Sequence, residues 1–425
     1  MDAQEIAELR ELMDYEGRRK GPPEGYPKFP DMPAGRYNSE EFYKLEKEEY
    51  WTKVWMMAGH MDEIPEVGSY KLWEMSGEPM LIVRGKDNVA RAFYNTCSHR
   101  GAPVIQEAYG QATGGLACKY HGWTYDFEGK LINLRDKRDF VDLDMDCRGL
   151  FPVRTEQFGK LIFITLDDDA IPLREFLGPV ASQWDDFDFA NTRLVHHYTW
   201  NLECNWKIAM EANMEVYHVK SIHPDTVDAG LDYRKNVNTL YPHGHSRMVA
   251  PTPDAVLAAM PPKPDHIPEI ESVGELPRTT TYSFHVDPNL VSPMGQTLFP
   301  MLFFWPDGLR KTKYELYWIG ADWGEGEMPQ EWKDQIDYFN VVITEDTQFG
   351  DWIQKSADSI AFKGVPLCYQ ESRIYHAHEN IDRVIGLNKV PDHLAVKQVL
   401  GEDWIYPNDS KLRLEESERM KQAAE

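Results

Sequence analysis

The chain is poor in cysteine and in positive charge. Its 425 residues include five cysteines, an odd and sparse number that argues against a disulfide framework and favours a reducing compartment. Lysine and arginine total 45 against 70 aspartates and glutamates, so the formal net charge is -25. Nucleic acid and anionic membranes are therefore unsuitable partners, because most of the surface would repel them.

Long hydrophobic runs are also missing. No apolar run approaches the length that crosses a bilayer, and residues 1–5 lack the basic stretch and apolar core of a signal peptide. The sequence therefore predicts a cytoplasmic protein that acts on a small molecule. Its length predicts two or three domains with ample core.

The pattern of strands and helices predicts an α+β protein in three parts. Residues 1–45 are charged and helical, and they are expected to pack on the largest domain. Residues 46–160 contain short alternating segments broken by glycine and aspartate, which indicates antiparallel strands. Residues 165–425 combine long strands with helices and form the third part.

Two segments of the third part allow alternative interpretations. Seven prolines punctuate residues 251–278, which predicts a loop with little regular structure. This loop is either a mobile lid over a substrate entrance or a passive surface excursion. The charged run over residues 415–419 predicts a solvated helix or a frayed tail.

Two short motifs each pair a cysteine with a histidine. Cys97 and His99 are separated by one residue, and Cys118 and His121 by two. Two thiolates and two imidazoles divided in this way suit a [2Fe–2S] cluster with two cysteines on one iron and two histidines on the other. A structural zinc site is the alternative, but zinc fingers usually group cysteine with cysteine.

A second set of metal-binding residue types lies near the middle of the chain. Glu211, Glu215 and His218 are spaced four and three apart, which places them on one face of a single predicted helix. His223 precedes Pro224, and a residue before proline is disfavoured in the helical region. We therefore expect His223 to leave the helix and turn back toward His218.

A further carboxylate is expected on a long amphipathic helix over residues 332–356. Asp346 falls in the buried stripe of this helix, where leucine would be ordinary, and Gly350 leaves room beside it. A buried carboxylate is costly unless a cation compensates it. With His218 and His223, Asp346 would complete the two-histidine, one-carboxylate set of non-heme Fe(II) oxygen chemistry.

The residues around both motifs resemble one family. The first pair of motifs is similar to the cluster-binding motifs of Rieske proteins, and the second resembles the iron motif of Rieske non-heme iron oxygenases. Specifically, the second is similar to the large (alpha) terminal oxygenase subunits of the aromatic-ring-hydroxylating family. The residues that carry the likeness are Asn95, Cys97, His99, Arg100, Gly101, Cys118, His121, Gly122, Trp123, Asn205, Trp206, Lys207, Glu215, His218, His223, Glu345 and Asp346.

The resemblance implies a fold and cofactors. An antiparallel-β Rieske [2Fe–2S] domain would occupy residues 46–160, and a helix-grip catalytic domain, an antiparallel sheet with helices, would occupy 165–425. A flavin reductase, a ferredoxin or both would relay electrons from NAD(P)H to the cluster. Mononuclear Fe(II) at His218, His223 and Asp346 would use them with O2 as co-substrate.

The resemblance also implies an assembly. Subunits would associate head to tail into a homo-oligomer, expected to be a trimer, with a small beta subunit as a possible addition. Glu215 matches a bridging carboxylate that is usually aspartate in the family. It would link His218 of its own chain to His121 of a neighbouring copy.

Apolar residues near these motifs are candidates for a substrate pocket. They favour an aromatic or alicyclic substrate, which would be hydroxylated or oxidatively dealkylated. A quaternary-amine (betaine- or carnitine-like) monooxygenase or demethylase is the alternative within the family. An electron-transfer or redox-sensing protein without catalysis and a zinc hydrolase are the alternatives outside it. The pocket candidates are Met210, Met214, Phe284, Phe303, Trp305, Phe349 and Ile353.

Overall fold

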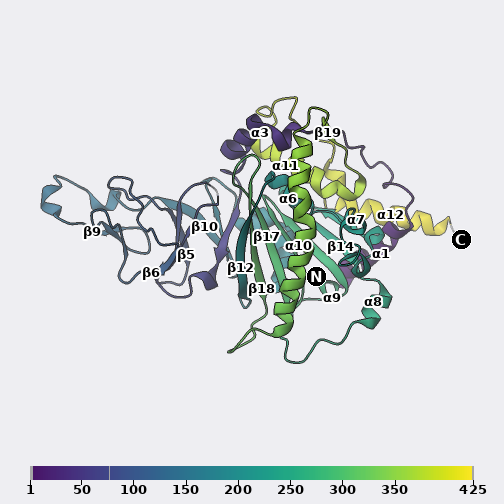
Figure 1. Ribbon diagram of the computed structural model, residues 1–425, viewed down its shortest axis with the longest axis horizontal. Coiled ribbons are helices and arrows are strands. Elements are labelled where there is room, and N and C mark those ends of the chain that lie inside the picture. The colour runs from purple at the N-terminus through teal and green to yellow at the C-terminus, as the bar shows by residue number, and fades with distance from the viewer. Residues whose placement is uncertain (1–2, 76, 424–425) are drawn as a thin grey trace. The chain divides into compact units, whose positions relative to one another are not determined.

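The computed structural model describes residues 3–75 and 77–423 and separates into two units (Figure 1). Residues 52–176 form one unit, and residues 1–51 together with 177–425 form the other. The boundaries thus lie a few residues beyond the expected 45/46 and about a dozen beyond the expected 160–165. The later boundary falls within α4 (Leu173–Leu177).

The described part of the 52–176 unit contains an antiparallel sheet of seven strands and a smaller sheet of three. The larger sheet has the order β2-β11-β10-β5-β4-β3-β6, and the smaller has the order β7-β8-β9. Aliphatic residues fill the centre of the larger sheet, and every residue of β11 is buried. The strands are β2 (Met56–His60), β3 (Ser69–Trp73), β4 (Met80–Arg84), β5 (Ala90–Tyr94), β6 (Tyr109–Gln111), β7 (Leu116–Ala117), β8 (Thr124–Tyr125), β9 (Leu131–Asn133), β10 (Pro152–Phe158) and β11 (Leu161–Thr165).

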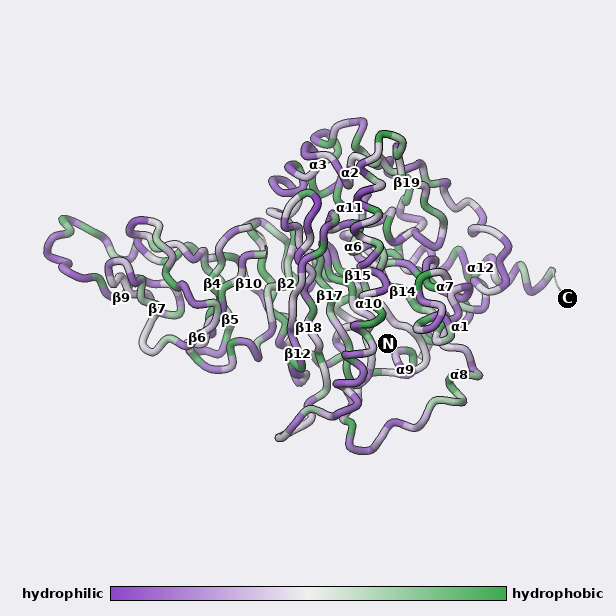
Figure 2. Tube along the Cα trace, in the orientation of Figure 1, coloured by the Kyte–Doolittle hydropathy of each residue, from purple (hydrophilic) through white to green (hydrophobic). Residues whose placement is uncertain are grey.

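The other unit is built on a second antiparallel sheet, with the order β12-β18-β17-β16-β15-β14-β13. Its long strand β17 is buried except at its last residue, and Figure 2 colours it largely hydrophobic. The strands are β12 (Arg193–Leu202), β13 (Val237–Leu240), β14 (Ser246–Pro251), β15 (Thr280–Val286), β16 (Leu290–Pro293), β17 (Leu298–Pro306) and β18 (Thr312–Gly320). A short pair, β1 (Met32–Pro33) with β19 (Gly364–Val365), lies outside this sheet.

Helices accompany this second sheet. The long helix α10 (Gln330–Ala357) crosses in front of the strands in Figure 1, and the ring centroid of Phe339 lies 5.2 Å from that of Trp318 on β18. The helix predicted over 332–356 is therefore confirmed, as is the α+β class with antiparallel sheets. The remaining α-helices of this unit are α1 (Ala3–Arg18), α2 (Gly35–Asn38), α3 (Glu40–Leu45), α5 (Pro179–Trp184), α6 (Trp206–Glu211), α7 (Val219–Ile222), α8 (Asp254–Ala259), α9 (Leu276–Thr279), α11 (Ser372–Ile385) and α12 (Asn408–Gln422).

The N-terminal segment belongs to the same unit as this sheet. After α3, a π-helix covers Glu46–Tyr50. The Tyr50 hydroxyl donates to Asp287 Oδ1 at 2.8 Å, and Lys207 Nζ donates to Glu46 Oε1 at 2.6 Å. These buried polar contacts fix the segment against residues far along the chain.

The single helix expected around Glu211, Glu215 and His218 is wrong. Helix α6 ends at Glu211, and α7 begins only at Val219. The Glu215 carboxylate accepts hydrogen bonds from the backbone N–H groups of Tyr217 and His218, so it stabilises a turn in place of a continuous helix. The expected release of His223 is confirmed, because α7 ends at Ile222.

The proline-rich segment 251–278 contains more structure than expected. Helices α8 and α9 lie at its two ends. Ile267, Ile270 and Val273 are buried, which anchors the second half of the segment to the unit. A lid role for this segment stays a prediction.

The C-terminal helix α12 is more than a solvated tail. Arg413 is buried and binds Asp409 Oδ2 at 2.6 Å and Glu16 Oε1 of α1 at 3.2 Å. A buried guanidinium between two carboxylates joins the two ends of the chain. No helix among the described residues has both the length and the apolar character needed to cross a membrane.

Replacing Arg413 with alanine should destabilise this unit by about 3–5 kcal/mol, because Asp409 would be left buried without a positive partner and Glu16 would keep only Arg19. The measurement is the free energy of unfolding from a urea titration. The control is Arg419→Ala, which removes an exposed ion pair with Glu24 and should cost less than about 1 kcal/mol. Equal losses in the two variants would contradict the role of Arg413.

Candidate metal centres and substrate cavity

The two cysteine–histidine motifs fold into equivalent turns. In each turn the cysteine carbonyl accepts a hydrogen bond of 2.9 Å from the N–H of the glycine four residues later, Cys97 from Gly101 and Cys118 from Gly122. Both glycines have φ of +73°, which side chains other than glycine rarely adopt. The sequence thus builds the same turn twice, once after β5 and once between β7 and β8.

The four side chains of these turns fit a [2Fe–2S] cluster. Cys97 and Cys118 are buried, and the ring centroids of His99 and His121 lie 4.6 Å apart. His99 stacks on Trp123, with centroids 4.8 Å apart and ring planes 7° from parallel. His99 Nδ1 is buried without a hydrogen-bond partner among the described residues, as expected of an atom that ligates a metal.

Tyr125 contacts one of these thiols. Its hydroxyl oxygen lies 3.1 Å from Cys97 Sγ and accepts a hydrogen bond of 3.2 Å from the Ser98 N–H. Because that N–H can only donate, the tyrosine proton is left for Cys97 Sγ or for Ser98 Oγ, which also lies 3.1 Å away. Hydrogen bonds to cluster sulfurs are one determinant of the reduction potential.

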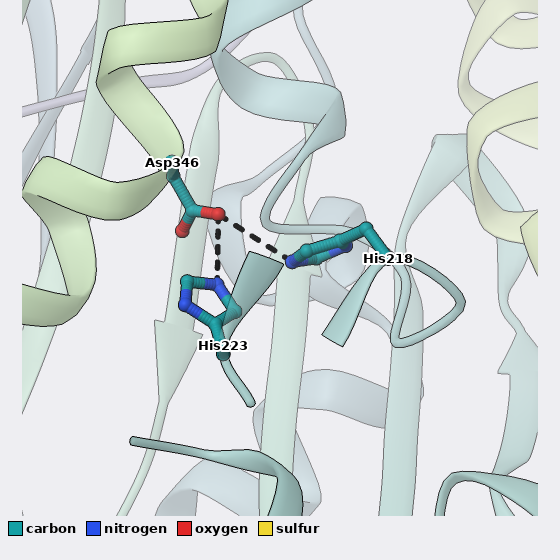
Figure 3. A group of neighbouring side chains, drawn as sticks. All are labelled: His218, His223 and Asp346. Atoms are coloured by element: carbon teal, nitrogen blue, oxygen red, sulfur yellow. Dashed lines mark hydrogen bonds and ion pairs between the residues drawn. The ribbon is translucent and has the colours of Figure 1, made fainter. Parts of the chain in front are cut away.

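His218, His223 and Asp346 lie together in the other unit (Figure 3). Asp346 Oδ1 lies 2.9 Å from His223 Nε2 and 3.4 Å from His218 Nε2. The three donor atoms lie within 4.8 Å of one another, close enough to hold one metal ion. Asp346 comes from α10, and the two histidines flank the short helix α7. Two imidazoles and one carboxylate are a suitable donor set for non-heme Fe(II).

A carboxylate orients each of these histidines from behind. Glu215 Oε1 lies 2.5 Å from His218 Nδ1, and Glu345 Oε2 lies 2.7 Å from His223 Nδ1. The Thr226 hydroxyl donates to the same Glu345 oxygen at 2.7 Å. Each Nε2 is therefore left to face Asp346, as in carboxylate–histidine–metal arrangements. Sequence reasoning expected the contact of Glu215 but gave Glu345 no role of its own.

The charges of this group favour a cation at its centre. Burial disfavours a charged imidazole, yet the hydrogen bonds that His218 donates to Asp346 and Glu215 outweigh it and raise the pKa of His218 to about 10. Burial likewise opposes ionisation of Asp346, but the two histidines lower its pKa below the usual value. The carboxylates that favour protonated imidazoles also favour a bound metal cation. Protons and a metal ion therefore compete for the imidazole nitrogens.

A cavity of about 320 Å³ reaches this group. His218, Asp346 and Glu215 form part of its wall, and most of the remaining wall is apolar. Phe349 and Ile353, two of the predicted pocket residues, line it. Residues that sequence reasoning missed also line it, among them Tyr37, Leu202, Ile208, Phe362, Val365, Leu367 and Ile374.

The other five predicted pocket residues do not line this cavity. Met210 and Met214 are buried but are not among the lining residues. Phe303 stacks on Trp305 with centroids 5.8 Å apart, and Phe284 packs against Trp184 at 6.3 Å. These three aromatic residues are sheet core.

The polar part of the wall is acidic. Glu211, Glu215, Asp346 and Glu371 contribute carboxylates. Among the described residues that line the cavity, none is a lysine or an arginine. The cavity therefore combines an apolar body with a polar wall that is rich in carboxyl groups.

Models of two domain families match the chain. The Rieske [2Fe-2S] domain matches residues 54–145, and the ring hydroxylating alpha subunit (catalytic domain) matches residues 189–387. The first match covers the two cysteine–histidine turns. The second covers both histidines and the aspartate of the metal group.

Two curated proteins and one solved structure illustrate the similarity. The 2-aminobenzenesulfonate 2,3-dioxygenase subunit alpha of Alcaligenes sp is 33% identical over 217 residues, 49% of this chain and 55% of that protein. The carnitine monooxygenase oxygenase subunit of Acinetobacter baumannii is 26% identical over 355 residues, 80% and 90% of the two chains. A quaternary ammonium Rieske monooxygenase crystallised with L-carnitine superposes with a TM-score of 0.70 at 21% identity, covering 87% of this chain and all of that one, which shows a shared fold.

Removing the hydroxyl of Tyr125 should lower the reduction potential of a bound cluster. In Tyr125→Phe the hydrogen bond to Cys97 Sγ is lost, so the extra negative charge of the reduced cluster is less well stabilised. The potential is measured by redox titration. Tyr109→Phe is the control, because that hydroxyl donates to Glu63; a potential unchanged in Tyr125→Phe contradicts this prediction.

Replacing Glu345 with glutamine should weaken mononuclear iron binding about 10- to 100-fold, because His223 loses the carboxylate that orients it. Iron affinity is measured by competition with a chelator, while cluster absorbance reports the other centre. The control is Glu331→Gln, at the exposed first turn of the same helix. Wild-type affinity in Glu345→Gln would count against the orienting role.

Proposed function

Because this chain belongs to the Rieske non-heme iron oxygenase alpha subunits, we propose that it is the terminal component of a multicomponent oxygenase. It would use O2 and electrons from NAD(P)H to hydroxylate or oxidatively dealkylate a small organic substrate with an aromatic or alicyclic body. The observation that carries the proposal is the group of His218, His223 and Asp346 in contact with a largely apolar cavity.

Each metal centre has a proposed set of ligands. Cys97, His99, Cys118 and His121 would hold the [2Fe–2S] cluster. His218, His223 and Asp346 would hold the mononuclear iron. When bound, these groups supply single electrons and an open coordination site for dioxygen.

The chain's own residues orient the metal ligands and form the surroundings of the substrate. Glu215 and Glu345 hold the two histidine rings so that each Nε2 faces Asp346. The apolar wall, including Phe349 and Leu202, excludes water from the space beside this group and places an apolar substrate there. The metal group thus contains three carboxylates, those of Glu215, Glu345 and Asp346, and two imidazoles. This composition makes the site well suited to a positively charged ion.

The proposal includes partners and an assembly. A flavin reductase, a ferredoxin or both would deliver electrons to the cluster of this soluble, cytoplasmic enzyme. Head-to-tail association into a trimer, with or without a small beta subunit, would bring the cluster of one subunit to the iron of the next. Glu215 would connect His218 to His121 of the neighbouring copy.

A second candidate within the same family is a quaternary-amine monooxygenase or demethylase. The observation that favours it is the acidic wall without lysine or arginine. An anionic substrate such as a sulfonate or carboxylate would find no lysine or arginine among the described lining residues. A cationic substrate would find several carboxylates.

Oxygen uptake tests the proposal. Wild-type protein with a surrogate reductase and NADH is screened against aromatic acids, methoxyaromatics, alicyclic compounds and betaines, and product is identified with labelled oxygen. Asp346→Ala should lose substrate-dependent uptake and all iron beyond the two cluster atoms, because a ligand is missing. Asp351→Ala, an aspartate on the same helix that pairs with Lys355, is the control. A protein that takes up no oxygen with any substrate, or an active Asp346→Ala, contradicts the proposal.

A further inference from the structure

Glu211 is a carboxylate of the cavity wall that takes no part in the metal group. It is the last residue of α6, and its side chain is 14% exposed. The Tyr37 hydroxyl lies 3.0 Å and 3.1 Å from its two oxygens, and His378 Nε2 lies 2.7 Å from Oε1. The carboxylate is thus held in a fixed position at the cavity surface.

The hydrogen-bond directions around Glu211 follow from its neighbours. Arg36 Nε can only donate, and it lies 2.7 Å from His378 Nδ1, so that nitrogen must accept. The proton of neutral His378 therefore sits on Nε2 and is donated to Glu211. With the tyrosine as a second donor, both contacts favour the ionised carboxylate.

The buried charges behind the wall do not neutralise Glu211. Arg36 is paired with Asp382 at 2.7 Å, and Lys207 is paired with Glu46 at 2.6 Å. All four of these side chains are at most 1% exposed. Two cations and two carboxylates cancel, so these pairs leave the negative charge of Glu211 uncompensated whenever its carboxyl group is ionised.

We propose that Glu211 binds the positively charged nitrogen of an amine substrate, either protonated or quaternary. This inference rests on the proposed function and names the substrate class and its recognition residue. The cavity of about 320 Å³ would hold the apolar body of such a molecule. The Tyr37 ring beside Glu211 adds an aromatic face, which also attracts ammonium groups.

The pH dependence of binding follows from the surroundings of Glu211. Burial raises the pKa of Glu211 to about 8, opposed by the hydrogen bond from Tyr37 and by the charges of Lys207 and Arg36, while Glu371 acts in the same direction as burial. Neutral His378 contributes its hydrogen bond without a net charge. Below this pKa the carboxyl group is protonated and loses its attraction for a cation. Affinity for a permanently charged ammonium should therefore rise as pH increases through about 8.

Two soluble molecules of the same shape test the proposal. Choline carries a quaternary nitrogen, and 3,3-dimethylbutan-1-ol has carbon in its place. Their affinities for the iron-loaded full-length protein are measured by calorimetry without oxygen. Glu211→Gln should weaken choline binding about 10- to 100-fold, as expected for losing a charged partner of 1.5–3 kcal/mol, and leave the neutral alcohol unchanged.

The matched control is Glu371→Gln, which removes another carboxylate of the same wall. The Glu371 side chain accepts a hydrogen bond of 2.8 Å from the Cys368 N–H and affects Glu211 by raising its pKa, so the variants are compared above pH 9, where Glu211 is ionised. Choline affinity should change less than about twofold. Equal losses in the two variants, or none in Glu211→Gln, would overturn the proposal. If Glu211→Gln does not fold, a pH-independent choline affinity of the wild-type protein overturns it.

The outcomes separate this inference from the proposed function. Substrate-dependent oxygen uptake with a neutral aromatic compound, together with choline binding insensitive to Glu211, retains the oxygenase and rejects the amine. Glu211-dependent choline binding without oxygen uptake for any substrate of the screen retains the recognition site and rejects the oxygenase.

Discussion

The structure of the larger unit depends on finding positive charge for buried carboxylates. An ionised carboxylate in a low-dielectric interior is strongly destabilised unless a cation or several hydrogen bonds compensate it. The chain supplies arginine or lysine for Glu16, Asp382 and Glu46. For Asp346 and Glu211 it supplies histidines and a tyrosine instead, and both face the same cavity. These two carboxylates are the places where positive charge from outside the polypeptide is most strongly favoured.

Local sequence patterns were sufficient for the features that depend on neighbours along the chain. The periodicity around Asp346 predicted α10 almost to the residue, and Pro224 predicted that His223 would leave its helix. The motifs at Cys97 and Cys118 could be recognised because the cysteine and histidine of each lie within four residues of one another. The same reasoning failed between Glu211 and His218, where helical spacing was intact but the Glu215 side chain caps a turn. Helix-forming residues do not reveal a competing hydrogen bond of this kind.

The cavity shows the limit of reasoning from proximity in sequence. Phe303 and Trp305 are aromatic and lie on a strand of the correct unit, yet they form sheet core. The true wall combines Tyr37, residues of α6 and α10, and residues 362–374. No pattern within one segment indicates that these distant segments converge. Glu211 was recognised as a candidate on the metal face, but its partner His378 lies more than 160 residues away, so its actual environment required the fold.

The break between α6 and α7 has a consequence for how the protein keeps its iron. His218 lies in a seven-residue interruption, and α7 has four residues. A short helix beside an irregular segment belongs to the low-stability end of local opening reactions, whereas the long strands of the sheet belong to the high-stability end. A metal ion joining this segment to α10 would act as a local cross-link. Iron loss should therefore begin as opening of one short segment, with the sheet intact, so inactivation can precede unfolding.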